Sequence, residues 1–64
     1  MKVLDSFTSA LGVIVILGVY KTPWSREFFS VETFNPNALF NSDEKFLTYD
    51  NAFDTFFDIV EQLR

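Results

Sequence analysis

The sequence lacks cysteine and histidine altogether. Without cysteine, no disulfide framework can stabilise the thin core that a 64-residue chain is able to bury. Without histidine, the chain lacks the commonest metal ligand and the usual general base at neutral pH, which argues against ligation of haem or chlorophyll. We therefore expect no cofactor and no metal site.

Basic residues are scarce, with five Lys and Arg against nine Asp and Glu and a formal net charge of -4. No basic patch is present, so nucleic acid is not an expected partner. Three acids, Asp50, Asp54 and Asp58, recur at every fourth position, but the glycine-containing turn of a calcium loop is missing. We interpret them as a solvated face, and we expect no enzymatic activity because no catalytic or nucleotide motif is present.

An uncharged run extends from Ala10 to Tyr20 and reads ALGVIVILGVY. If Val3 to Tyr20 forms one helix, a rise of 1.5 Å per residue gives about 27 Å, close to the hydrocarbon thickness of a bilayer. No small-x-small cleavage site follows, which favours an uncleaved single-pass anchor over a signal peptide. The predicted fold class is all-α, with an N-terminal transmembrane helix, an irregular aromatic connector and a C-terminal amphipathic acidic helix.

These three parts define the predicted domains. Residues 1–24 form the membrane-spanning helix with interfacial ends, residues 25–41 an interfacial turn and connector, and residues 42–64 the amphipathic extramembrane helix. Within the connector, Asn35-Pro36-Asn37 is a turn signal. We expect Phe34, Leu39 and Phe40 to pin the connector in place.

A buried β-strand is the alternative for the apolar run. Val13 to Leu17 is rich in β-branched residues and is bracketed by Gly12 and Gly18, and periodicity alone cannot separate a buried strand from a buried helix. Residues 29–34 could pair with it. We favour the helix because only two plausible strands are apparent, and a two-stranded sheet needs further support.

A helix over the apolar run would place four small or polar residues on one side, namely Asp5, Thr8, Ser9 and Gly12. Such a side permits close approach of another helix in lipid, and we interpret it as a helix-packing face. The alternative is that short polar residues occupy the end of a helix that leaves the membrane. After the run, Lys21 and Trp24 are predicted to lie at the membrane interface. The basic residues that follow the run place the C-terminal arm on the cytoplasmic side.

The C-terminal part has the strongest helical periodicity, with apolar residues at i, i+3, i+4 and i+7 between Ala52 and Leu63. It forms either one helix from Asp43 or a short helix followed by a second helix capped near Thr48 or Asp50. Acids on the polar face would be repelled by anionic lipids, so a protein is the better partner. Alternatively, the apolar face folds back on residues 28–40. The predicted partner-binding arm consists of Phe28, Phe29, Phe53, Phe56, Phe57, Val60 and Leu63.

In layout, the chain resembles the small accessory subunits of respiratory or photosynthetic membrane complexes, and this resemblance is one of architecture. It implies a non-catalytic single-pass subunit that stabilises a larger integral membrane complex. Its partners are then that complex and the lipid bilayer, and lipids or pigments could touch the chain without being ligated by it. Two alternatives stay open: a structural membrane protein of a virion or other lipid-containing particle, and a small soluble oligomeric binding module with the apolar stretch buried.

Overall fold

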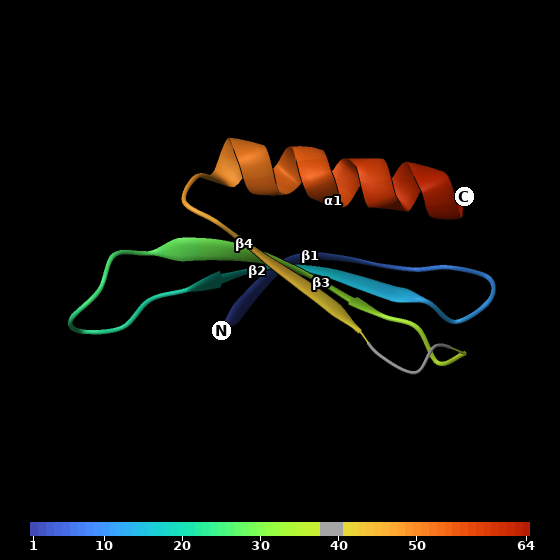
Figure 1. The fold of residues 1–64 in the computed structure, drawn as a ribbon, viewed down its shortest axis with the longest axis horizontal. Coiled ribbons are helices and arrows are strands. Elements are labelled where there is room, and N and C mark those ends of the chain that lie inside the picture. The colour runs from blue at the N-terminus through green and yellow to red at the C-terminus, as the bar shows by residue number, and fades with distance from the viewer. Residues whose placement is uncertain (38–40) are drawn as a thin grey trace.

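The computed structural model describes residues 1–37 and 41–64, which form a four-stranded antiparallel sheet with a helix across one face (Figure 1). The strands are β1 (Lys2–Thr8), β2 (Ile14–Tyr20), β3 (Phe28–Phe34) and β4 (Ser42–Phe46), and the helix α1 spans Tyr49–Leu63. The order in the sheet is β1-β2-β3-β4, so every strand pairs with its neighbour in the sequence.

The strand register decides which residues share a face of the sheet. Leu17 of β2 lies opposite Val31 of β3 and, on its other side, opposite Asp5 of β1. Because successive side chains point to opposite faces, the residues next to these in each strand belong to the other face. We call that other face, which α1 does not cover, the open face. It comprises Val3, Ser6 and Thr8 of β1, Ile14, Ile16, Gly18 and Tyr20 of β2, Phe28, Ser30, Glu32 and Phe34 of β3, and Asp43 and Lys45 of β4.

The core lies between the two central strands and the helix. It consists of Val15, Leu17, Val31, Ala52, Phe56 and Val60, with Phe7, Phe29, Phe46, Ile59 and Leu63 packed around it. The helix begins where the Thr48 side chain accepts a hydrogen bond from the Asn51 amide, an N-cap that satisfies one otherwise unpaired donor. Of the two helix starts that the sequence left open, the later one is observed, but the short helix expected before it is absent because β4 occupies Ser42–Phe46.

The predicted all-α fold class is wrong, because residues 2–20 form two strands instead of one helix. The β-strand alternative for Val13 to Leu17, paired with residues 29–34, describes β2 and β3. In β2, alternate residues Val15 and Leu17 pack under α1, and β-branched side chains suit such a pleated surface. Two strands that the sequence did not reveal, β1 and β4, widen the sheet and remove the objection to a two-stranded one.

None of the helices in the described part of the chain is long and apolar enough to cross a membrane. The predictions of a transmembrane helix, a single-pass accessory subunit of a membrane complex, an integral membrane location and a cytoplasmic C-terminal arm are therefore wrong. One face of the apolar run is instead covered by the chain's own helix: Val15 and Leu17 are fully buried against it. The amphipathic face of α1 supplies the cover that lipid was expected to supply.

The predicted boundaries also change within this fold. The segment 25–41, expected to be an irregular connector, contains β3, and the segment 42–64 begins with β4 before the helix starts. Residues 38–40 lie outside the described part of the structure, so the predicted roles of Leu39 and Phe40 fall there. The turn signal at Asn35-Pro36-Asn37 coincides with the end of β3, where the Asn37 amide donates to the Asn35 side-chain oxygen at 2.9 Å.

The turn between β1 and β2 depends on Gly12, which has a φ of +87°. The Gly12 amide donates to the Ser9 carbonyl at 3.0 Å, and the Val13 amide donates to the Ser9 hydroxyl at 3.1 Å. This left-handed backbone conformation is unfavourable for residues with a Cβ atom, whereas glycine adopts it freely.

We expect Gly12→Ala to lower the free energy of unfolding by about 1 kcal/mol, because alanine must adopt the left-handed conformation. The added Cβ has space, since its nearest neighbour, Pro36 Cγ, would lie at 3.6 Å. Urea unfolding followed by circular dichroism measures the change. Leu11→Ala, in the same turn and largely exposed, is the control with little expected effect. Equal midpoints for Gly12→Ala and the parent chain would contradict this account of the turn.

Candidate functional site

Four aromatic rings form a continuous row along one side of α1. Phe29 of β3 meets Tyr49 edge to face at 5.8 Å between ring centroids, Tyr49 stacks on Phe53 at 5.8 Å, and Phe53 stacks on Phe57 at 6.2 Å. The three helical rings are spaced by four residues, so one turn of α1 separates each from the next. Their exposed fractions are 44%, 37% and 48% for Tyr49, Phe53 and Phe57. We call this row the aromatic ridge.

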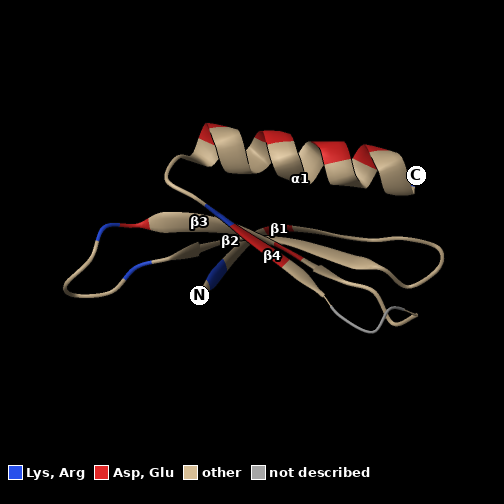
Figure 2. Cartoon of the chain, viewed as in Figure 1, with Lys and Arg blue, Asp and Glu red and all other residues tan. Residues whose placement is uncertain are grey.

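A row of carboxylates runs beside the aromatic ridge. Asp50, Asp54 and Asp58 each follow one helical ring by one residue, and all three are exposed. Figure 2 shows acidic positions along the outer side of α1, away from the sheet. Within residues 1–37 and 41–64, the ion pair found joins Arg64 and Glu61 at 3.4 Å, so the three aspartates have no cationic partner there. The helix thus presents an apolar and an acidic stripe side by side.

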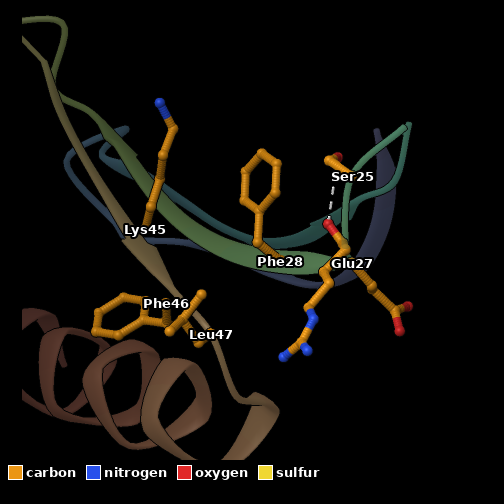
Figure 3. A pocket seen from close by; sticks show the side chains of 7 residues that line it. Ser25, Glu27, Phe28, Lys45, Phe46 and Leu47 are labelled. Atoms are coloured by element: carbon orange, nitrogen blue, oxygen red, sulfur yellow. Dashed lines mark hydrogen bonds between the residues drawn. The ribbon is translucent and has the colours of Figure 1, made fainter. Parts of the chain in front are cut away.

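A separate hollow of about 340 Å³ lies at the end of the sheet where β3 begins and β4 ends (Figure 3). It is lined by Ser25, Arg26, Glu27, Phe28, Lys45, Phe46 and Leu47. Figure 3 shows Phe28 and Lys45 on one side of the sheet, whereas Phe46 and Leu47 lie on the side that carries the helix. Phe28 also stacks on Tyr20, with ring centroids 5.1 Å apart.

The polar groups of this hollow include one hydroxyl that is bonded locally. The Ser25 hydroxyl donates to the Arg26 carbonyl at 3.4 Å and also contacts the Thr22 hydroxyl. Glu27 is the one carboxylate in the lining. Among the described residues, no three acidic side chains gather in a way that could hold a metal ion. The hollow is therefore an apolar depression with charged margins.

The four residues predicted to form a helix-packing face do not share one side in the structure. Asp5 lies opposite Leu17 on the face that α1 covers, whereas Thr8 lies opposite Ile14 on the open face. Ser9 and Gly12 belong to the turn that follows. The predicted face depended on the helical period of 3.6 residues, whereas side chains in a strand alternate between faces with a period of two. The four residues therefore do not form one helix-packing face.

Lys21 and Trp24, predicted to mark a membrane interface, lie in the loop between β2 and β3. Trp24 is 85% exposed, which makes it the most exposed of the described aromatic side chains. In Figure 2 the basic positions of this loop lie at the end of the sheet where β3 begins. Because β2 ends at Tyr20, no helix end is available for these residues to anchor.

The seven residues of the predicted partner-binding arm divide into two groups. Phe56 and Val60 are buried in the core and Leu63 packs against it. The helix face folds back on the chain's own residues, but these include Val15 and Leu17 of β2 and not only the residues 28–40 of the fold-back alternative. Phe29, Phe53 and Phe57 belong to the aromatic ridge, and Phe28 lies on the open face against Tyr20. Contact of the last four with a partner stays a prediction.

The predicted partner-binding arm did not include Tyr49, although the Tyr49 ring links Phe29 of β3 to the other rings of α1. The signal that could have found it is a repeat of an aromatic residue followed by aspartate at every fourth position: Tyr49-Asp50, Phe53-Asp54 and Phe57-Asp58. With this spacing, a helix aligns the three rings in one stripe and the three carboxylates in the next.

Compared with known proteins, the chain shows no match to a family model, to a curated protein or to a solved structure, so its function has to be argued from its own surfaces.

Proposed function

We propose that this chain is a non-catalytic protein-binding module whose aromatic ridge binds a segment of another protein that carries both basic and apolar side chains. The observation that carries the proposal is the exposed row of Tyr49, Phe53 and Phe57 beside three aspartates that form no ion pair with any described residue. The exposed rings can bind apolar side chains of such a segment, and the adjacent aspartates can bind its basic side chains.

The rings are suited to binding because they are already ordered. Phe53 stacks on Tyr49 on one side and on Phe57 on the other. Tyr49 also contacts Phe29 of the sheet. Aromatic side chains that are fixed before binding lose little conformational entropy on association, and such residues often dominate the affinity of interfaces. Apolar side chains of the partner would cover the rings.

The charge of the partner follows from the adjacent carboxylates. Asp50, Asp54 and Asp58 stand on successive turns, and the net charge of the chain is -4. Such a distribution attracts a basic segment over a distance and repels an acidic one. Lys and Arg also bind the faces of aromatic rings through cation–π contacts, so one basic side chain can contact a ring and the neighbouring aspartate.

A peptide titration tests this proposal. We expect a synthetic amphipathic peptide of Lys and Leu to shift the amide NMR signals of residues 49–58, and its Glu and Leu counterpart to leave them unchanged. Phe57→Ala should weaken binding about tenfold, as expected for the loss of one exposed interface ring. Added salt should weaken binding further, because the charges are exposed.

Trp24→Ala is the matched control for this titration, because it removes a ring that is more exposed but lies in the loop between β2 and β3. We expect this variant to bind the Lys and Leu peptide as the parent chain does. Equal affinity for the two peptides, or signal shifts confined to residues outside α1 and Phe29, would contradict the proposal.

A further inference from the structure

The open face of the sheet is apolar at both ends. No helix or strand of the described chain packs across it, and the Met1 side chain lies over Gly18 near its centre. At one end Ile14 and Phe34 lie directly opposite each other, each 38% exposed. At the other end Tyr20 and Phe28 are paired and stacked. Sheets with two apolar faces are normally covered on both sides, and α1 covers the opposite face.

Charged residues on the open face are distributed unevenly. Glu32 of β3 lies directly opposite Asp43 of β4, a pairing of like charges that is unfavourable between neighbouring strands. Lys45 lies on the same face, two residues further along β4 and opposite Ser30. None of these three takes part in an ion pair within the described chain. The two acids are therefore open to a cation from another molecule.

We propose that a second copy of this chain covers the open face in a symmetric, face-to-face dimer. The two-fold axis lies between the two sheets, runs across the strands and passes midway between Lys45 and Asp43. It reverses the strand direction in the second copy. Lys45 of each copy then lies over Asp43 of the other, next to Glu32. The same operation places the Tyr20 end of one open face over the Ile14 end of its partner. One surface thus complements itself, as a two-fold interface demands.

Pairing through the sheet edges is disfavoured by the edge strands themselves. β1 carries an irregularity between Val3 and Asp5, which interrupts the regular row of backbone groups. The other edge strand, β4, is only five residues long and contains Asp43, Glu44 and Lys45 in succession. Short, charged or bulged strands resist the addition of another strand. Association by the face is therefore favoured over association by an edge.

Sedimentation velocity over a wide range of protein concentration tests the dimer. We expect the parent chain to change from monomer to dimer as the concentration rises, and Lys45→Glu to raise the dissociation constant at least about tenfold, because like charges would then meet across the interface. The double variant Lys45→Glu/Asp43→Lys exchanges the two charges and should recover most of the lost affinity.

Lys2→Glu is the matched control, because Lys2 lies opposite Val19 on the face that α1 covers and undergoes the same change of charge. It should dimerise as the parent chain does. Circular dichroism confirms that each variant is folded before sedimentation. A parent chain that sediments as a monomer at every concentration would overturn the proposal. So would equal effects of Lys45→Glu and Lys2→Glu, or a folded double variant that fails to recover.

Discussion

Phe56→Ala is expected to leave most of the chain unfolded. Phe56 is 6% exposed and lies in the core between α1 and the two central strands. Removal of a buried phenylalanine ring costs about 3–5 kcal/mol, because contacts are lost and a cavity is left. Small domains have little stability to spare, so a loss of this size approaches the whole free energy of unfolding. Urea unfolding followed by circular dichroism gives the measurement.

Phe53→Ala provides the comparison for Phe56→Ala, since it makes the same chemical change three residues earlier on the same helix. Phe53 belongs to the aromatic ridge and is 37% exposed, so its removal leaves no closed cavity. We expect a loss well below that of Phe56→Ala. Similar losses for the two variants would show that the observed core and ridge are assigned incorrectly.

Leu17→Lys is expected to prevent folding. Leu17 is fully buried between β1, β3 and α1, and a lysine there would replace an apolar core side chain with a charged one whose cross-strand carboxylate is Asp5 of the edge strand. Removing a charge from water costs several kcal/mol even when it is paired, and the apolar contacts of Leu17 are lost as well, so the total approaches the whole free energy of unfolding of a small domain. The expected result is a circular dichroism spectrum without the native sheet and helix signals, and no cooperative transition in urea.

Ile16→Lys is the control, one residue away on the opposite face of the sheet. Ile16 is half-buried on the open face and lies opposite Glu32, so in the monomer a lysine there can extend to solvent beside a carboxylate. We expect this variant to fold. Opposite effects of lysine on folding at two adjacent positions are expected only for a strand that has one face covered and the other open. If both variants fold, or neither does, the strand assignment of residues 14–20 is contradicted.

The helix was the element that the sequence predicted best. The spacing of Ala52, Phe56 and Val60 identifies one face of a helix, and the structure buries those three residues. Thr48 was among the candidate caps, and it is the observed N-cap. Such a pattern is reliable because fifteen residues repeat one period and a polar cap marks the start.

The strands could not be identified as easily. An uninterrupted apolar run is compatible with a membrane helix and with a strand, and only a further strand partner decides between them. That partner was hidden, because Lys2–Thr8 carries charged and polar residues and Ser42–Phe46 starts with the Ser-Asp-Glu sequence of a helix N-terminus. Both are edge strands, where polar residues are expected. The information that overturned the membrane helix therefore lay outside the apolar run.

The candidate site was predicted in part. Phe29, Phe53 and Phe57 were singled out as partner-binding residues. They now form one row with Tyr49, in which the three rings of α1 are exposed and Phe29 is half-buried. The sequence could not show that Phe56 belongs to the core and Phe57 does not, because both fall within a broad apolar sector of the helix. Only the position of the sheet decides which of two adjacent rings is buried.

The simple order of the strands has a consequence for the rate of folding. Because β1, β2, β3 and β4 pair in sequence order, every pairing closes a short segment of chain and loses little loop entropy. Each hairpin can form without waiting for a distant part of the polypeptide, while α1 finds its place once β2 and β3 provide a surface. A chain with such local connections should reach its native state quickly, faster than sheets of similar size whose strands are joined by long crossovers.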